Sequence, residues 1–457
     1  MLRAFQNWYD DHFDEIIRDF STFLSFPSIS TDPAYKKEVV NCSEWIVSYL
    51  KKLDLDTEIW ETSGHPTIFA KNLRAGVHRP TLLIYHHYDV QPVTPLDLWK
   101  SDPFQPEIRD DSIYARGAVD NKGQCFYTLT AIKAFLELGE KYNFNLKLCI
   151  EGEEETGSHG LISILDKKKE DLLTDYILII DTDMVDKDHP AITLGVRGIA
   201  TLNIEWRVAS ADLHSGTFGG FVLNPVRALA STLNKCWDEK GRVAIPNFYD
   251  NIRTFSEEEL SAIDWDQNVQ EMGKPFDIKA YSKENGFSYL ESNWIRPTLE
   301  INGFESGYTG KGFKTIIPSK ASVKLSCRLI ADQDPEIISE LVVDFFEEHK
   351  PEGIEMSVEL GHGSTGFITT PHSKIAKIVS KAYEDVFAVP CKRVLCGGTL
   401  PIAPSIVEAT GGELVLMGVG LPEDAIHSPN ESFALNRFKM GFLSVVRIFQ
   451  ILSTEEG

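Results

Sequence analysis

The sequence predicts an α/β protein: a mixed, mainly parallel sheet with helices on both faces, into which an α+β domain is inserted. Strand and helix patterns alternate from the N-terminal region to about residue 190. Such alternation is typical of right-handed βαβ crossovers, which build a parallel sheet. Near Gly195 the pattern changes to long strands that alternate polar and apolar side chains. That alternation indicates an antiparallel sheet with one solvated face.

The first part of the chain contains amphipathic helices and then buried strands. Asp10–Phe26 has apolar residues at helical spacing and ends before Pro27, and Val39–Leu53 is a second such helix. A third helix is expected at Gln124–Leu138. Four apolar runs are predicted to be strand interiors: Leu82–Tyr85, Leu146–Ile150, Tyr176–Ile180 and Leu414–Met417.

The second part has the order β-α-β-β-α-β, which is the split βαβ, ferredoxin-like unit. Residues 238–290 interrupt it with an acidic, aromatic stretch of weak periodicity, and a helix at Ser373–Phe387 restarts the first pattern. We therefore predict one domain from residues 1–194 and 367–457, with residues 195–366 inserted as a second. The expected elements of the insert are Ala200–Ala209, Asn224–Cys236, Pro297–Ile301, Ala321–Ile330, Pro335–His349 and Ile354–Leu360.

Length and composition limit the class of protein. A chain of 457 residues is too long for one ordinary core. The net charge of −23 argues against nucleic acid and anionic membranes as partners. No apolar run approaches the roughly 18 residues that span a bilayer, and no secretory signal pattern is visible. The seven cysteines lack CxxC spacing, so we expect a reducing, cytoplasmic location.

Carboxylates and histidines directly follow the predicted strands. The carboxyl ends of parallel strands meet at one edge of a sheet, where functional groups gather. Several carboxylates converging there would repel one another unless a cation held them together. The sequence therefore predicts a metal site, with hydrolysis as its chemistry. The residues concerned are His87, Asp89, Asp120, Glu151, Glu153, Glu154, Glu155, Asp181, Asp183 and His427.

Each of these residues has an ordinary explanation when taken alone. Asp120 lies at a helix start, where Asp is a favoured N-cap. Glu153–Glu155 could be an exposed acidic turn, and His427 a solvated loop residue. The joint placement at strand ends, not any single residue, carries the metal-site prediction.

Five linked motifs resemble the M20 metallopeptidases, and within them the cytosolic non-specific dipeptidase and carnosinase group. The motifs occur in the family's order, and the resemblance runs from the first helix to the end of the chain. At one position the chain departs from the family, because His86 stands where glycine is usual; we expect it to crowd the loop or alter the local polarity. The motifs are Tyr85–Pro92, Arg116–Gly123, Glu151–Ser158, Asp212–Gly220 and His427–Glu431.

The resemblance implies a zinc-peptidase-like catalytic domain that holds two divalent ions, Zn²⁺ or Mn²⁺, both of which suit these ligands. The implied bridging ligand is Asp120, and the peptide that follows it is cis in the family. Glu154 is the implied general base, activating a water between the ions. Asp89 is implied to orient His87. The remaining ligands are implied to be His87 and Asp181 for one ion, and Glu155 and His427 for the other.

The resemblance also implies residues that contact the substrate. His214 corresponds to an oxyanion-stabilising histidine, although its sequence alone suits a polar loop residue. Arg328 would bind the substrate carboxylate bidentately, although a solvent-facing arginine fits its strand equally well. Gly398 and Thr399 would offer backbone amides to the same carboxylate. The family further implies a homodimer through the inserted lid domain, with His214 reaching the partner's metal centre.

Three functions fit these residues. The first is hydrolysis of dipeptides or short peptides, which the dipeptidase-like motif flanks favour. The second is removal of acyl or carbamoyl groups from amino acids on the same scaffold, because the metals contact only the scissile amide. The third is a non-catalytic binding protein, which the complete set of ligands and base argues against.

Overall fold

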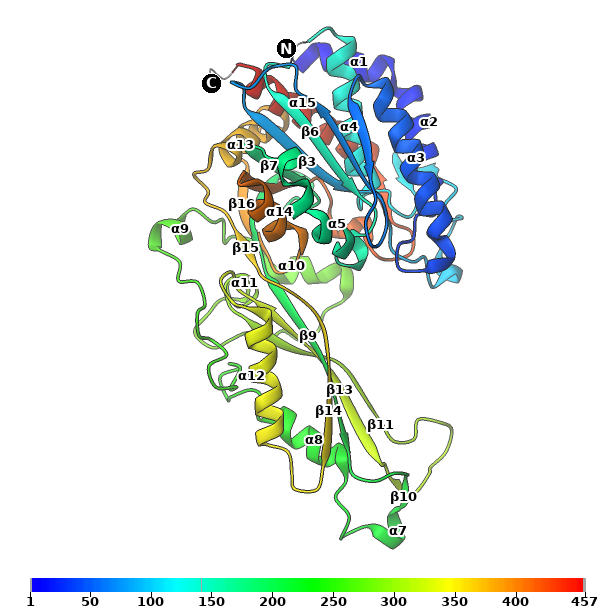
Figure 1. The fold of residues 1–457 in the computed structure, drawn as a ribbon, viewed down its shortest axis with the longest axis vertical. Coiled ribbons are helices and arrows are strands. Elements are labelled where there is room, and N and C mark those ends of the chain that lie inside the picture. Colours follow the sequence, from blue (N-terminus) through cyan, green and yellow to red (C-terminus); the bar gives the residue numbers. More distant parts are fainter. Residues whose placement is uncertain (1, 141, 455–457) are drawn as a thin grey trace.

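Two sheets divide the chain between an upper and a lower lobe of an elongated molecule (Figure 1). The computed structural model describes residues 2–140 and 142–454. The upper lobe contains both termini and a nine-stranded sheet, and the lower lobe contains a four-stranded sheet. The predicted fold class is confirmed.

The nine-stranded sheet places the four predicted strand interiors side by side. β6, β3, β7 and β17 are consecutive neighbours and run parallel, so their carboxyl ends share one edge. At both edges of the sheet, the outer strands pair antiparallel with their neighbours. Its order is β1 (Asp56–Trp60), β2 (Thr67–Asn72), β6 (Asn145–Glu151), β3 (Thr81–His87), β7 (Tyr176–Ile180), β17 (Glu413–Met417), β8 (Ala191–Val196) and β15 (Phe367–Ile368), while β16 (Lys392–Cys396) also pairs with β8.

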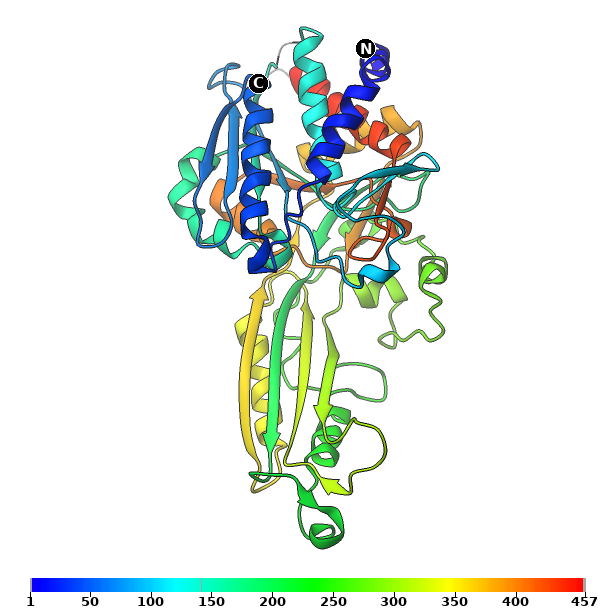
Figure 2. The same ribbon diagram turned by 90° about the vertical axis from the view of Figure 1, so that its right-hand side faces the viewer.

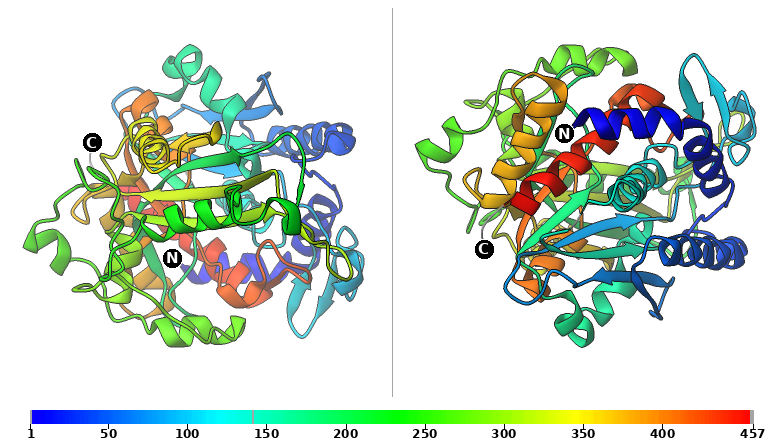
Figure 3. Two further views of the ribbon diagram at one scale, coloured as in Figure 1. Left: turned by 90° about the horizontal axis from the view of Figure 1, so that it is seen from below. Right: turned by 90° about the horizontal axis from the view of Figure 1, so that it is seen from above.

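Helices cover both faces of this sheet (Figure 3). Alternate strand residues enter two different cores: Leu82 and Ile84 pack in one, and Leu83 and Tyr85 in the other. This is the two-residue period of a strand buried on both faces. The first core includes α1 (Leu2–Asp11), α2 (Phe13–Leu24), α3 (Lys36–Lys52), α4 (Lys122–Glu137), α13 (Lys374–Phe387) and α15 (Leu435–Thr454), and the second includes α5 (His159–Ile164), α6 (Lys169–Leu172) and α14 (Ile402–Thr410).

The lower lobe is the predicted split βαβ unit (Figure 2). All its strand pairs are antiparallel. Two helices pack on one face through Leu229 and Val342, while the polar residues of the central strand are only half-buried on the other face. The order is β11 (Thr298–Ser306), β13 (Lys320–Leu329), β9 (Gly198–Arg207) and β14 (Glu355–Ser364), with α8 (Pro225–Asn234) and α12 (Pro335–Glu348).

Smaller elements complete the chain. The far tip of the lower lobe has β10 (Leu213–His214) paired with β12 (Ile316–Ile317), followed by α7 (Ser215–Phe218). In the upper lobe, β4 (Glu107–Arg109), β5 (Ser112–Tyr114) and β18 (Ser432–Ala434) form a small sheet. None of the described helices is both long and apolar enough to cross a membrane.

Residues 238–290 return from the lower lobe to the upper one. They contain α9 (Glu257–Ser261) and α10 (Val269–Gly273), and α11 (Tyr289–Trp294) begins within them. Ile263 and Leu290 join the upper core, and the Asp264 carboxylate accepts a hydrogen bond from the Arg393 amide at 2.8 Å. This segment therefore forms part of the wall above the sheet edge.

The chain changes sheets twice. It passes from β8 to β9 between Val196 and Gly198, and from β14 to β15 between Ser364 and Phe367. These crossings support our proposed division into domains 1–194 with 367–457 and 195–366.

Candidate metal centre

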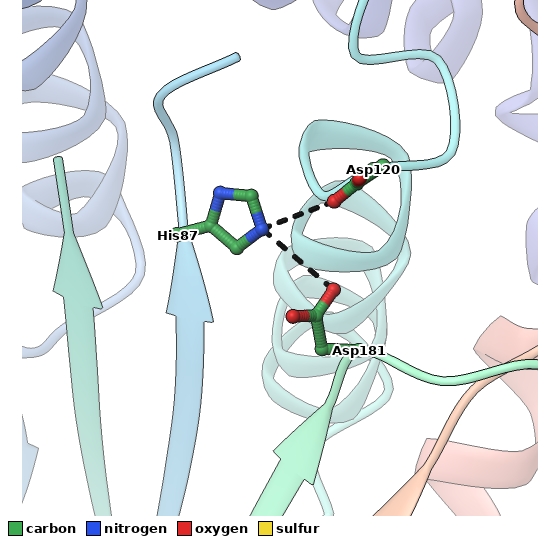
Figure 4. A group of neighbouring side chains, drawn as sticks. All are labelled: His87, Asp120 and Asp181. Atoms are coloured by element: carbon green, nitrogen blue, oxygen red, sulfur yellow. Dashed lines mark hydrogen bonds and ion pairs between the residues drawn. The ribbon is translucent and has the colours of Figure 1, made fainter. Parts of the chain in front are cut away.

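One group of predicted ligands lies where β3, β7 and the loop before α4 meet (Figure 4). His87 ends β3, Asp181 follows β7, and Asp120 lies two residues before α4. The His87 Nε2 is 3.1 Å from Asp120 Oδ1 and 3.7 Å from Asp181 Oδ1. Their donor atoms are close enough to bind one ion.

A second group shares Asp120. His427 Nε2 lies 2.8 Å from Asp120 Oδ2 and 3.3 Å from Glu155 Oε2. The two oxygens of Asp120 thus face two different histidines. These groups contain all five predicted ligands, and Asp120 is common to both.

The Glu154 carboxylate lies beside the first group, with its Oε2 3.9 Å from His87 Nε2. The buried Asp89 holds both residues from behind. Its carboxylate lies 3.3 Å from His87 Nδ1 and accepts the backbone N–H of Glu154 at 3.2 Å and of Glu155 at 3.1 Å. A carboxylate in this position fixes the imidazole orientation, and it also links the β3 end to the Glu154 loop.

A buried ion pair holds the Asp120 loop in place. Glu431 is fully buried and accepts from Arg116 Nη1 at 2.8 Å. It also accepts the backbone N–H groups of Gly117, Val119 and Asp120 at 2.8, 2.9 and 3.1 Å. The antiparallel pairing of β5 with β18 brings these distant segments together. Sequence reasoning placed Glu431 in a motif but gave it no role.

Burial and mutual repulsion perturb the carboxylates. Burial raises the pKa of Glu154 well above its usual range, and burial followed by the Asp120 charge raises the pKa of Glu155 to about 7. Burial would lower the pKa of His87, but Asp181 and Asp120 outweigh it and hold that pKa well above its usual value. Hydrogen bonds to Asp120 and Glu155 raise the pKa of His427 to about 10. Histidines and neutral amide donors, such as Asn121 beside Asp181 and Gln91 beside Glu155, share the stabilisation of this convergent negative charge.

These residues fit divalent metal ions. Two imidazole nitrogens with carboxylate oxygens are a donor set that suits Zn²⁺ and Mn²⁺. Glu155 Oε1 is buried and has no hydrogen-bond partner within the described chain. An oxygen in that situation costs free energy unless a cation or water satisfies it.

A cavity of about 420 Å³ opens beside the centre. Asp120, Glu154, Asp181 and His427 line one side, and the loop of residues 396–400 lines another. Arg328 Nη1 donates to Thr399 Oγ1 at 2.7 Å, so the guanidinium lies against this loop. Trp294 from α11 closes part of the wall. The predicted carboxylate-binding residues therefore lie in one neighbourhood with the metal centre.

His214 is not part of this neighbourhood. It is exposed on β10, at the far tip of the lower lobe (Figure 1). The ten residues of β9, which lead from the upper lobe toward that tip, span about 33 Å. Its Nδ1 accepts the backbone N–H of Gly216 at 3.1 Å, which leaves Nε2 as the outward-facing nitrogen. Within one chain, His214 cannot reach the metal centre.

Comparison with known proteins agrees with this geometry. Residues 83–450 match the model of peptidase family M20/M25/M40. The Cys-Gly metallodipeptidase dug1 of Schizosaccharomyces pombe is 30% identical over 94% of this chain and 93% of that protein. The human Beta-Ala-His dipeptidase is 28% identical over 96% of this chain and 90% of its own length. The solved structure of an M20 family metallo-carboxypeptidase from Sulfolobus solfataricus has a TM-score of 0.87 and 31% identity, covering 96% of this chain and all of that one.

The ion pair behind Asp120 gives a testable prediction. Glu431→Gln leaves the Arg116 charge buried without its counter-ion, so we expect the free energy of unfolding to fall by about 3–5 kcal/mol. Urea unfolding measures this. Glu423→Gln, an exposed residue of the same loop, is the control and should change stability little. A loss below about 1 kcal/mol in Glu431→Gln, the usual limit for exposed ion pairs, would contradict this role.

Proposed function

Because the chain belongs to peptidase family M20/M25/M40, we propose that it hydrolyses dipeptides with two divalent ions, Zn²⁺ or Mn²⁺. The family makes the chain an M20-type, dipeptidase-like hydrolase. One observation supports the two-ion proposal most directly: two ligand groups share Asp120, and the Glu154 carboxylate lies next to them.

The proposed mechanism assigns each residue one task. Two ions in such a site lower the pKa of the attacking water and stabilise negative charge on the carbonyl oxygen. Glu154 takes the proton of that water and passes it to the leaving amine. Its raised pKa, caused by burial, suits a group that must hold a proton between the two steps. Asp89 fixes the position of His87 relative to the Glu154 loop, because its carboxylate contacts both.

The substrate carboxylate is proposed to bind at Arg328 and the Gly398–Thr399 loop. Arg328 is half-buried, and among the described residues its side chain donates a hydrogen bond to Thr399. No described carboxylate forms an ion pair with it, so the guanidinium is available to an anion. A dipeptide carries such an anion at its C-terminus, close to the scissile bond.

We propose that His214 acts on the partner's metal centre in a homodimer formed by the lid domains. The position of His214 at the far tip supports this proposal. Because His214 cannot reach the metal centre of its own chain, it could act in catalysis only at the metal centre of another subunit. Phe221 and Phe313, close in sequence to α7 and β12, are 72% and fully exposed. Exposed aromatic side chains of this kind are typical of an interface. His214 Nε2 would donate to the developing oxyanion.

The cytoplasm is the proposed location. All seven cysteines are free, and six of them are buried, which suits a reducing compartment. The deacylase and binding-protein alternatives lack a specific observation in their favour.

The base is tested by Glu154→Gln. The amide cannot accept the proton of water, so we expect both ions to stay bound while kcat falls about 10²–10⁴-fold. Glu155→Gln is the matched comparison, because there a ligand is removed and an ion should be lost. Metal analysis with dipeptide kinetics distinguishes the two variants. Near-normal turnover of metal-loaded Glu154→Gln would exclude the role.

Carboxylate recognition is tested with a panel of dipeptides, dipeptide amides and N-acyl amino acids. Loss of a charged hydrogen bond in Arg328→Met should lower kcat/KM for dipeptides about 10–150-fold, mainly through KM. Dipeptide amides lack the carboxylate that Arg328 is proposed to bind. We therefore expect the wild-type protein to hydrolyse them poorly and Arg328→Met to change their kcat/KM little. Arg207→Met, on the neighbouring strand, serves as the control. A wild-type preference for N-acyl amino acids over dipeptides would instead favour the deacylase.

Subunit mixing tests His214. A His214→Ala chain and a Glu154→Gln chain should each be inactive alone, and together regain about a quarter of wild-type activity. Random exchange makes about half the dimers mixed, and each mixed dimer of two-fold symmetry has one complete site.

The control pairs Glu154→Gln with the double variant His214→Ala/Glu154→Gln, which cannot form a complete site. If the first mixture stays inactive after demonstrated subunit exchange, or if an isolated monomer is fully active, His214 does not act across an interface.

A further inference from the structure

His86 lies directly behind the metal centre. It is fully buried and shares the face of β3 with Leu82 and Ile84, opposite to the face of His87. Its Nε2 is 3.0 Å from Thr128 Oγ1 on α4, and its Nδ1 is 2.9 Å from Asn121 Oδ1. These contacts fit one of the two expectations for a histidine at the usual glycine position, a change of local polarity. His86 adds polar contacts behind the ligand loop.

The Asn121 side chain connects His86 to a predicted ligand. Asn121 Nδ2 donates to Asp181 Oδ1 at 2.6 Å and to the Ile180 carbonyl at 2.7 Å. Both partners are acceptors, so they use both hydrogens of the amide nitrogen and fix which end of the amide faces Asp181. The Asn121 oxygen must then face His86.

This orientation determines the tautomer of His86. An amide oxygen only accepts, so His86 Nδ1 must carry the hydrogen in their contact. A neutral imidazole has a single N–H, and the contact with the Asn121 oxygen places it on Nδ1. Nε2 then faces the Thr128 hydroxyl at 3.0 Å, which itself donates to the Gln124 carbonyl at 3.1 Å. The hydrogen-bonded series runs from α4 through His86 and Asn121 to Asp181.

We propose that His86 is a positioning residue: its Nδ1–H holds the Asn121 amide so that Asp181 is presented to the ion bound by His87, Asp120 and Asp181. Asn121 immediately follows Asp120, so the same contact steadies the loop of the shared ligand. Contacts of this kind behind a ligand set its orientation and basicity. The inference rests on the proposed two-ion site.

Loss of the donor would affect the two ion sites unequally. Without Nδ1–H, the buried Asn121 oxygen is unsatisfied, which favours rotation of the amide. Rotation turns that oxygen toward Asp181, where two acceptors repel. Among the described residues, Glu155 and His427 form no hydrogen bond with Asn121 or His86, so the second ion site should lose less affinity than the first.

The test compares His86→Leu with His86→Asn. The two replacements have similar size and shape, and asparagine places an N–H donor where His86 has Nδ1. Zn²⁺ is titrated into each metal-free, full-length protein against a chromophoric chelator. We expect His86→Leu to bind one of two Zn²⁺ ions about 10–100-fold more weakly, with a lower kcat and an unchanged KM. His86→Asn should recover most of that affinity.

Each outcome is decisive. Normal binding of both ions by His86→Leu, or equal losses in His86→Leu and His86→Asn, overturns the proposal. A role in folding alone would lower the thermal midpoint of His86→Leu without changing affinity. If His86→Leu does not fold, His86→Gln replaces it, because its amide lies at the position of Nε2 and faces Thr128. Failure of the proposed function is distinguishable, since the wild-type protein itself would then bind fewer than two Zn²⁺ ions.

Discussion

The concentration of buried negative charge at the carboxyl ends of β3, β6 and β7 is the constraint that organises this structure. Asp120, Glu154, Glu155 and Asp181 converge there, and burial raises the pKa of Glu154, Glu155 and Asp181. Such a cluster is stable only with positive charge at its centre. The residues behind it, such as Asp89, Glu431 and Asn121, hold the ligands and the base in place through directed hydrogen bonds.

The contacts behind the ligands come from separate parts of the chain. Glu431, beside β18, holds the loop of Asp120, while Asp89 after β3 holds His87 and the Glu154 loop. His86 and Asn121 hold Asp181 from the side of α4. A parallel sheet makes this possible, because it brings strand ends from the whole chain to one edge. The long lower lobe also separates His214 from its own metal centre, and in the proposed homodimer a second chain would supply this histidine.

Much of this arrangement could be predicted from the sequence. Apolar runs such as Tyr176–Ile180 mark buried strands, and the polar residue after each run marks the sheet edge, so the fold and the grouping of ligands followed. The pairing of Glu431 with Arg116 spans 315 residues and depends on the register of β5 and β18, which no local pattern encodes. The role of His86 depends on the amide orientation of Asn121. That orientation is set by contacts with His86 on β3 and with Ile180 and Asp181 at the end of β7. In the sequence, the departure from glycine signalled only that something differed there.

Metal-edge anomalous diffraction from crystals soaked in Zn²⁺ tests the central claim most directly, because it locates each ion independently of activity. The account predicts two peaks about 3.5 Å apart, the usual two-metal spacing, with one oxygen of Asp120 on each. His87 and Asp181 should contact the first ion, and Glu155 and His427 the second. A single peak, or two peaks that Asp120 does not bridge, would contradict it.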